Sequence, residues 1–280
     1  DRLAQLIAAE AGCAGPAANV SAACAGAAQA VGNAFRMIRR GERDCALAGG
    51  ADSVLNLETM SALHVLGAPS TETRFGHALC RPFDAARSGL VAGEGAGYLV
   101  LESLPHARAR GARIIAELVG YGSSLDGYKL TAPDPQGRGA AAAMQAALAD
   151  ARIAPGAIDL VNAHGTSTRL NDVSETRAIR SVFADDGHAQ RLSITANKSQ
   201  FGHLIAAAAA PELIATALSC RDDIVPPTLH LDQPDPECDL DYTPRQARAR
   251  RVEFALSNSF GFGGLNACLV LRKHRAEAHA

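Results

Sequence analysis

Short strand-like segments alternate with helical stretches along the chain, and this alternation limits the folds open to it. The strand-like segments are apolar, contain β-branched residues or are bounded by glycine, and lie at 18–23, 44–50, 95–102, 112–121, 157–163, 192–196, 252–257 and 266–272. The clearest helices lie at 24–40, 138–152, 172–184 and 203–221. The pattern indicates an α/β fold with mixed sheets.

The composition argues against several classes of protein. With 280 residues and a net charge of −2, the chain has room for two halves and lacks the basic excess of a nucleic-acid binder. Its seven cysteines, at 13, 24, 45, 80, 220, 238 and 268, include no Cys-x-x-Cys pair, so neither a disulfide framework nor a zinc site is indicated. No apolar run reaches the roughly 20 residues of a membrane span, and no leader is recognised. We therefore expect a cytoplasmic protein that binds no nucleic acid and no membrane.

Three separated motifs carry nucleophilic and basic side chains: Ser21-Ala22-Ala23-Cys24-Ala25-Gly26, His164-Gly165-Thr166-Ser167-Thr168 and Lys198-Ser199-Gln200-Phe201-Gly202-His203. Cys24 follows an extended run and opens the helix 24–40, so we expect its sulfur at a strand-to-helix turn, where the helix dipole favours a thiolate. Taken alone, such a cysteine is more often a small buried apolar residue, since free cysteine is among the most buried residue types.

The histidines and the lysine favour the reading of Cys24 as a nucleophile. His164 ends the apolar strand Ile158–Ala163 and His203 begins the helix 203–221, so both are predicted at the ends of elements. A lone histidine is more often a hydrogen-bonded structural residue, and a lone lysine is often an ordinary surface residue. Two histidines beside Lys198 and a helix-opening cysteine are hard to assign to packing alone. We expect Lys198 to orient a histidine or to supply positive charge where anions form.

Four further motifs accompany these three: Arg81-Pro82-Phe83-Asp84, Gly93-Glu94-Gly95-Ala96-Gly97, Thr131-Ala132-Pro133-Asp134 and Asn258-Ser259-Phe260-Gly261-Phe262-Gly263-Gly264. With all seven motifs in this order, the chain resembles the elongating 3-oxoacyl-acyl carrier protein synthases. These are the condensing enzymes of fatty acid and polyketide synthesis in the thiolase superfamily. The resemblance implies a thiolase-like fold, layered αβαβα with mixed five-stranded sheets.

The resemblance also predicts the domain organisation. Residues 1–112 would form part of a first half that carries the nucleophile, and residues 113–280 a second half with the histidines, the lysine and a glycine-rich gate loop. The family has a block of strands and helices before the helix that reads here as Leu3–Glu10. We therefore expect the first half to be incomplete, in a partial sequence or a truncated chain.

By resemblance, the reaction is a decarboxylating Claisen condensation. Cys24 accepts the acyl group, and His164 and His203 stabilise the enolate that forms when a malonyl thioester loses carbon dioxide. The thioester oxyanion would be held by the backbone N–H groups of Cys24 and of Phe262. The glycines of the loop Gly261–Gly263 let the backbone approach a ligand and let the loop move as a gate.

Other residues take supporting parts. Thr166 and Thr168 match positions where the family hydrogen-bonds the phosphopantetheine arm; otherwise they are loop hydroxyls that cap the helix near Asp172. Glu175 matches a buried acidic residue that pairs with the backbone or with the lysine, and we assign it and Asp172 to structural support. The motifs contain two more candidates for substrate binding: Thr131 and Asn258.

The implied partner is an acyl carrier protein, which brings the phosphopantetheine, and no metal or bound organic cofactor is implied. A homodimer, or a heterodimer with a similar subunit, is implied as well. The basic run Arg245–Arg251 is more readily a solvated face than a docking site for the acidic carrier.

Alternative readings remain within the same fold. An initiating synthase would use Cys, His and Asn, whereas the motif around His203 favours the elongating type. A thiolase would need a second catalytic cysteine, but Cys268 lies in the last strand-like segment. A non-catalytic partner subunit of the chain-length-factor type would lack the nucleophile that Cys24 supplies. The last alternative is an inactive truncated fragment.

Overall fold

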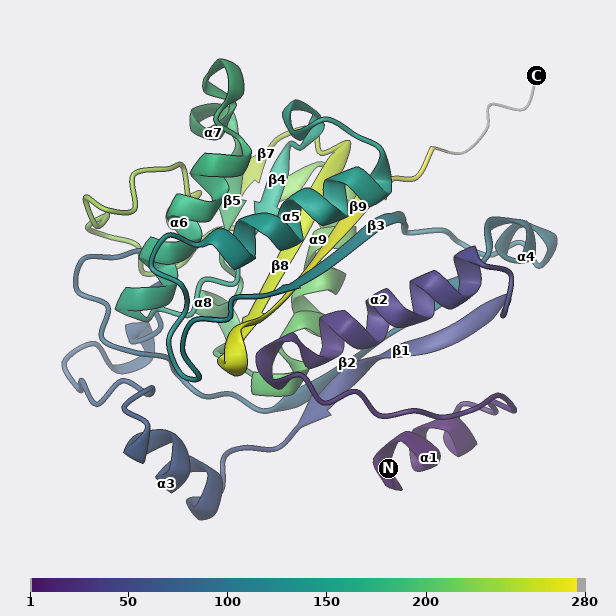
Figure 1. The fold of residues 1–280 in the computed structure, drawn as a ribbon, viewed down its shortest axis with the longest axis horizontal. Coiled ribbons are helices and arrows are strands. Elements are labelled where there is room, and N and C mark those ends of the chain that lie inside the picture. The colour runs from purple at the N-terminus through teal and green to yellow at the C-terminus, as the bar shows by residue number, and fades with distance from the viewer. Residues whose placement is uncertain (1, 276–280) are drawn as a thin grey trace.

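The computed structural model describes residues 2–275, and its main element is a five-stranded sheet with the strand order β3-β9-β8-β4-β5 (Figure 1). The strands are β3 (Ala116–Leu125), β4 (Leu160–Asn162), β5 (Ser193–Thr195), β8 (Phe254–Gly261) and β9 (Leu265–Lys273). β9 pairs antiparallel with β3 and β8, whereas β4 is parallel to β8 and β5. The sheet is therefore mixed, as predicted.

Two helices separate this sheet from a second, two-stranded one. β1 (Cys45–Asp52) and β2 (Gly95–Glu102) pair antiparallel, and α2 (Gly26–Arg39) and α9 (Ala209–Asp222) contact strands of both sheets. On the opposite face of the five-stranded sheet, α5 (Arg138–Ala151) packs over β3 and β9, with α6 (Arg169–Val182) beside it. The order helix, sheet, helix, sheet agrees with the predicted layered fold, and the described residues of the first half supply only two strands of its sheet.

Glycines in β3 allow α5 to pack closely against the sheet. A Cβ at Gly122 would lie 2.2 Å from the carbonyl oxygen of Ala143, and one at Gly120 would lie 2.4 Å from that of Ala147. Only glycine permits backbone contact at this distance. The close packing buries the side chain of Met144, a residue of α5, completely.

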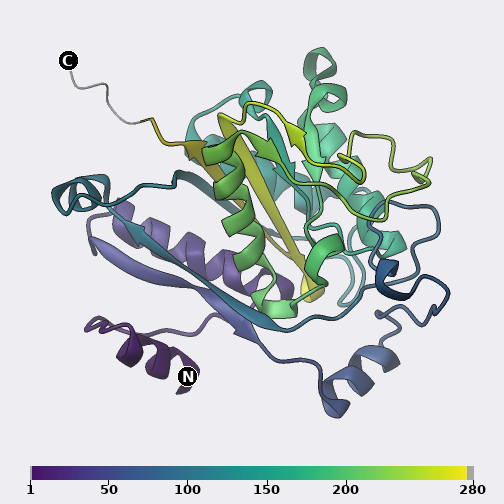
Figure 2. The same ribbon diagram turned by 180° about the vertical axis from the view of Figure 1, so that it is seen from behind.

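The remaining elements are short or peripheral. They are α1 (Arg2–Glu10), α3 (Leu57–Val65), α4 (Leu104–Ala109), α7 (His188–Arg191), α8 (Lys198–Phe201), β6 (Ile224–Val225) and β7 (Arg248–Ala249). α1 lies beyond β1 and β2 in Figures 1 and 2, and none of its residues is buried. None of the described helices has the length and apolar character that crossing a bilayer requires.

Several predicted elements differ from the structure. The strands predicted at 112–121 and 252–257 span Ala116–Leu125 and Phe254–Gly261, and three further differences lie close to the motifs. The segment 18–23 is irregular and pairs with no strand among residues 2–275. The helix predicted at 172–184 begins at Arg169, because the side chain of Thr168 caps it by accepting from the N–H of Asn171. The helix predicted at 203–221 begins at Ala209, since the positive φ angles of Gly202 (77°) and Ile205 (46°) interrupt the helical path. His203 therefore lies in a loop.

Candidate active site

Cys24 lies in a single 3₁₀ turn, Ala23–Ala25, that leads directly into α2. The residue is 6% exposed. Ala23 has a φ angle of 46°, in the region that favours glycine, so the turn before the helix is strained. The chain thus delivers the sulfur to a helix N-terminus as the sequence indicated, but from an irregular segment and not from a strand.

Burial and nearby donors act in opposite directions on the protonation of Cys24. Burial raises the pKa of this thiol from 9.0 to about 11, while the charge of Lys198 and the backbone N–H groups of Phe262 and Cys24 lower it by less. The N–H at the helix N-terminus favours the thiolate, as expected, but burial outweighs this effect, so the resting side chain is a thiol at neutral pH. The backbone N–H groups of Cys24 and Phe262 are donors beside the sulfur.

The two histidines meet at the same point as the cysteine. His164 lies two residues beyond the end of β4, and His203 lies in the loop between α8 and α9. Their rings are 5.4 Å apart between centroids and nearly perpendicular, at 86°. The Sγ atom of Cys24 and one ring nitrogen from each of His164 and His203 lie within 4.8 Å of one another, and all three residues are buried. The fold therefore brings together three side chains from separate motifs.

Lys198 lies behind His164 and is completely buried. Its Nζ donates to the carbonyl oxygen of His164 (2.6 Å), contacts Nδ1 of His164 (3.1 Å) and forms an ion pair with Oε1 of Glu212 (2.5 Å). Glu212 was missed at the sequence level, although it is the only charged residue between His203 and Arg221. Burial raises the pKa of Glu212 to about 7, against the lowering effect of Lys198.

The hydrogen bonds of the two imidazoles set their tautomers. Nδ1 of His164 faces the three-donor ammonium group of Lys198, and Nδ1 of His203 accepts from the backbone N–H of Ile205 at 3.1 Å. Burial, and then the charge of Lys198, lowers the pKa of both histidines well below the usual value. Both rings are therefore neutral at pH 7, and we assign the proton of each to Nε2.

This arrangement fits an anion better than a metal ion. A thiol and two imidazoles within 4.8 Å have the composition of a metal site. A metal on Nε2 would require the proton on Nδ1, where Lys198 and Ile205 already present donors. The neighbours of the rings thus favour two Nε2–H donors, which stabilise a developing oxyanion.

Glu175 and Asn258 support His164 from behind. The carboxylate of Glu175 accepts from the backbone N–H groups of His164 (2.8 Å) and Gly165 (2.9 Å) and from the side-chain amide of Asn258 (3.0 Å). Asn258 is completely buried and is not among the residues that line the cavity described below. Asp172 is also buried, and it accepts from the backbone N–H of Phe83 at 2.9 Å. All three side chains are thus engaged in buried hydrogen bonds, and Asn258 lies outside the lining of the cavity.

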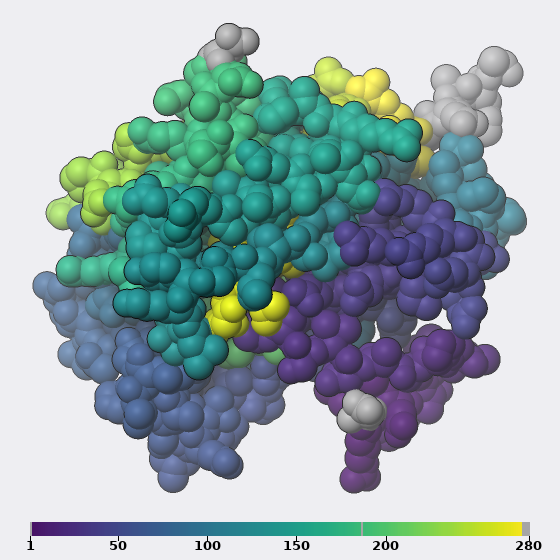
Figure 3. Space-filling view, viewed as in Figure 1, coloured from purple at the N-terminus to yellow at the C-terminus, as the bar shows by residue number. Residues whose placement is uncertain are grey.

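A cavity of about 490 Å³ opens onto Cys24 and both histidines. Its apolar lining includes residues of α3 and of the segment that follows it, and its polar lining includes Thr131, Thr166 and Thr168. The hydroxyls of Thr166 and Thr168 lie 2.8 Å apart, and Thr168 also caps α6. In the space-filling view, C-terminal residues (yellow) reach the surface between N-terminal (purple) and middle (teal) segments (Figure 3). Both halves of the chain therefore enclose the cavity.

The loop after β8 closes one wall of this cavity. Gly261, Phe262 and Gly264 line it, and a Cβ at Gly261 would lie 3.1 Å from the backbone nitrogen of Cys24. Gly263 has a φ of 82°, and its N–H donates to the carbonyl oxygen of Leu130 at 2.6 Å. Glycine thus permits a close approach at position 261 and suits the positive φ at position 263.

Comparisons with known proteins relate most of the chain to one family of sequences. The model of the beta-ketoacyl synthase N-terminal domain matches residues 2–107, and that of the C-terminal domain matches residues 115–232. A curated relative, 3-oxoacyl-[acyl-carrier-protein] synthase 2 of Staphylococcus aureus (strain COL), is 44% identical over 95% of this chain and 63% of its own length. The synthase of the same description from Synechocystis sp. is 43% identical over 94% of this chain and 63% of its own length.

Solved structures agree with the sequence relatives. A type II PKS acyl-carrier protein in complex with its ketosynthase matches with a TM-score of 0.94 and 38% identity, over 97% of this chain and 66% of that chain. The ishigamide ketosynthase/chain length factor matches with a TM-score of 0.91 and 40% identity, over 98% of this chain and 65% of that chain. A beta-ketoacyl synthase from Burkholderia phymatum matches with a TM-score of 0.86 and 43% identity, over 91% of this chain and 61% of that chain. The chain thus spans slightly less than two thirds of the length of the curated relatives that it matches.

Proposed function

This chain belongs to the beta-ketoacyl synthase family, and on that premise we propose that it joins an acyl group on Cys24 to malonyl-acyl carrier protein with loss of carbon dioxide. The product would be a 3-oxoacyl-acyl carrier protein of fatty acid or polyketide synthesis. The observation that carries the proposal is the convergence of the Cys24 sulfur with His164 and His203, whose Nδ1 atoms are both engaged by donors.

The first step is acyl transfer. The sulfur of Cys24 attacks the thioester carbonyl, the C–S bond to the carrier arm breaks, and the thiol proton passes to the departing sulfur. The backbone N–H groups of Cys24 and Phe262 hold the oxyanion, which forms beside the sulfur that they already face. Because the proton moves from one sulfur to the other, this exchange requires no net base.

The second step forms the carbon–carbon bond. The bond between the malonyl methylene and its carboxylate breaks, carbon dioxide leaves, and the electron pair becomes an enolate whose oxygen accepts from the two Nε2–H groups. The enolate carbon then attacks the acyl carbonyl, and Cys24 leaves as a thiolate that takes up one proton. Each such donor is expected to lower the barrier by about 2.7–4 kcal/mol.

Lys198 and Glu212 act through His164. The ammonium group of Lys198 holds Nδ1 and the backbone oxygen of His164, and its ion pair with Glu212 compensates the charge in a fully buried place. Lys198 thereby keeps His164 in the donor tautomer. Its charge also lies near the sulfur of Cys24 and stabilises the thiolate at the end of the second step.

The partner and the assembly follow from the same proposal. An acyl carrier protein would bring the phosphopantetheine arm past Thr131, Thr166 and Thr168, which line the cavity. The two halves would meet near residue 112, between the two matched family models. We further propose a cytoplasmic dimer, either of two identical chains or with a similar subunit; one solved relative is a ketosynthase/chain length factor.

Intact mass spectrometry tests the first step. The parent protein and the variants Cys24→Ala and Cys13→Ala are incubated with an acyl-carrier thioester. We expect the acyl mass increment on the parent and on Cys13→Ala, whose exposed thiol serves as the control, and none on Cys24→Ala. Absence of the increment from all three would contradict the proposal and would favour a non-catalytic subunit.

The second step is tested on the acylated enzyme. Malonyl-carrier is added, and the 3-oxoacyl product and carbon dioxide are measured for the parent and for His203→Ala. Loss of one oxyanion donor is expected to lower the rate of condensation about 10²–10³-fold, while acylation of Cys24 persists. Equal condensation by the two proteins would exclude the role given to His203.

A further inference from the structure

We propose that the segment 80–93, which we call the strap, positions His203 and the loop of Thr166 and Thr168, with Arg87 as its main positioning residue. The strap precedes the boundary near residue 112, yet most of its hydrogen bonds run to residues beyond that boundary. This inference rests on the proposed function, because it assigns the strap a part in substrate binding and condensation.

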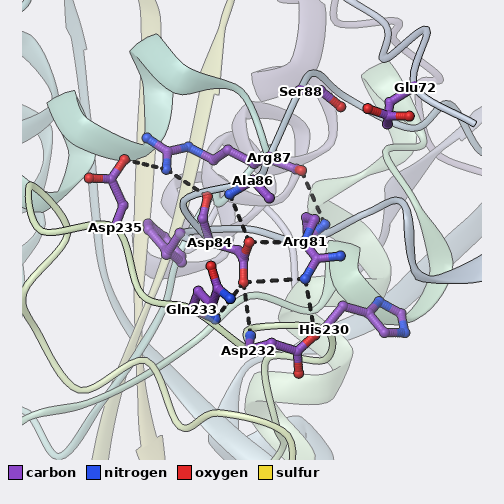
Figure 4. A network of polar contacts seen from close by, with 12 residues as sticks. Glu72, Arg81, Asp84, Ala86, Arg87, Ser88, His230, Asp232, Gln233 and Asp235 are labelled. Carbon is purple, nitrogen blue, oxygen red and sulfur yellow. Dashed lines mark hydrogen bonds and ion pairs between the residues drawn. The ribbon is translucent and has the colours of Figure 1, made fainter. Parts of the chain in front are cut away.

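The first anchor of the strap is the carboxylate of Asp84 (Figure 4). This side chain is completely buried. Its Oδ2 accepts from the backbone N–H groups of Asp232 and Gln233, both at 2.8 Å, and its Oδ1 accepts from that of Ala86 at 2.8 Å. Arg81 donates from Nε to the same carboxylate at 3.0 Å and reaches Asp232 at 3.0 Å. A buried carboxylate with this many donors fixes the strap to the loop at 232–233.

Phe83 adds an apolar anchor between these charges. Its ring is completely buried and stacks on Tyr242, with 3.7 Å between ring centroids. Its backbone N–H donates to Asp172 of α6 at 2.9 Å, and its φ of 66° is one that a non-glycine residue rarely adopts. The ring contact with Tyr242 and the hydrogen bond to Asp172 therefore hold this part of the strap in one conformation.

The second charged anchor is the guanidinium group of Arg87, whose side chain is 1% exposed. Nη1 donates to Asp235 at 2.6 Å, and Nε lies 3.3 Å from the carboxylate of Asp172. Nε also donates to the carbonyl oxygen of Thr168 at 3.3 Å, and Nη2 to that of Arg169 at 3.3 Å. One side chain thus holds the backbone of the threonine loop and the first turn of α6 together.

The strap then contacts the segments that carry the candidate catalytic groups. The N–H of Gly89 donates to the carbonyl oxygen of Ser167 at 3.1 Å, between the two threonines. Further along, the carbonyl oxygen of Val91 accepts from the N–H of His203 at 2.7 Å, and the N–H of Gly93 donates to the carbonyl oxygen of His203 at 2.9 Å. Because His203 is outside any helix, these two bonds define its backbone position.

Cys24 is framed by other segments. A Cβ on Gly261 would contact both its backbone nitrogen and Ala22, so the loop after β8 and the residues before α2 surround it. Displacing the strap should therefore disturb His203 and the threonine loop more than the sulfur. A displacement of about 1 Å at a reacting group can cost about 100-fold in rate.

The test compares Arg87→Lys and Asp235→Asn with the control Glu237→Gln. Lysine keeps the charge of Arg87 but loses the planar fork, so it cannot hold Thr168, Arg169 and Asp235 together. Glu237 lies in the same loop as Asp235 and pairs with Arg177 of α6 at the surface, outside the strap. All assays are run well below the melting temperature of each variant.

Two rates are compared for each protein. Alkylation of Cys24 by iodoacetamide, followed by peptide mass spectrometry, requires neither the carrier arm nor His203. We expect Arg87→Lys to lower kcat/KM for condensation with malonyl-carrier by about 10- to 100-fold, with a raised KM for the carrier and alkylation within twofold of the parent. Asp235→Asn should show a smaller decrease, and Glu237→Gln none. Equal losses in alkylation and condensation, or a lower melting temperature with unchanged kinetics, would overturn the inference.

A spectroscopic measurement separates this inference from the proposed function. If the parent fails to condense its substrates, the proposed function is wrong, but the position of His203 can still be followed by NMR of its ring nitrogens. Arg87→Lys is expected to shift the His203 signals, and Glu237→Gln to leave them in place. Unchanged His203 signals in Arg87→Lys would overturn the role of the strap.

Discussion

Glu212 should make the stability of this protein fall as the pH rises from 4.5 to 7. The carboxyl group is completely buried, only Oε1 reaches Lys198, and Oε2 has no partner among residues 2–275. Burial raises its pKa from 4.5 to about 7 in the folded state. Between these values the folded chain keeps a proton that the unfolded chain releases, so the free energy of unfolding decreases with rising pH.

The size of the effect follows from the two pKa values. The difference between 4.5 and about 7, at 1.36 kcal/mol per pH unit, amounts to about 3 kcal/mol. Substitution Glu212→Gln removes the titration, while Lys198 retains the two acceptors on His164. Relative to this variant, the parent should lose about 3 kcal/mol of stability between pH 4.5 and 7, with little further change above pH 7.

Urea unfolding at a series of pH values measures this difference. Both proteins are unfolded between pH 4.5 and 8, and the free energy of the variant is subtracted from that of the parent at each pH, so that titrations common to both cancel. Glu237→Gln, which removes a surface ion pair expected to contribute about 0–1 kcal/mol, serves as the control. A flat difference curve for Glu212→Gln, or one that rises with pH, would refute the reasoning.

Three further predictions concern the nucleophile and the core. Since the pKa of Cys24 is about 11, its alkylation by iodoacetamide should rise about tenfold per pH unit between pH 7 and 9; a plateau in this range would contradict the raised pKa. Gly261→Ala would place a Cβ 3.1 Å from the nitrogen of Cys24 and displace an oxyanion donor, so acylation by an acyl-carrier thioester should slow about 10²-fold or more; a rate within threefold of the parent would be inconsistent with this. Phe83→Ala, which removes a buried ring stacked on Tyr242, should cost about 3–5 kcal/mol in urea unfolding, and a loss below 1 kcal/mol would argue against the packing described.

Local patterns predicted two elements almost to the residue, although β2 has no buried residue and α5 buries only part of its surface. β2 spans 95–102 as predicted, and α5 spans Arg138–Ala151 against a predicted 138–152. The segment 18–23 has the composition of a strand, but a strand also requires a neighbour, and none lies beside it in the described chain. The helix predicted from residue 203 begins at Ala209, because the backbone of His203 pairs instead with Val91 and Gly93.

The sequence alone determined which chemical groups the protein has and in which motifs they stand: a cysteine before a helix, two histidines, a lysine and a glycine-rich loop. Tertiary structure decided their chemical state. The thiol of Cys24 is protonated because surrounding segments bury it, and the tautomers of both imidazoles depend on Lys198 and Ile205. Glu212 lies on α9, and only the packing of this helix brings its carboxyl group to Lys198. Burial and hydrogen-bond partners arise largely from residues distant in the sequence, so protonation and orientation are settled only once the chain is folded.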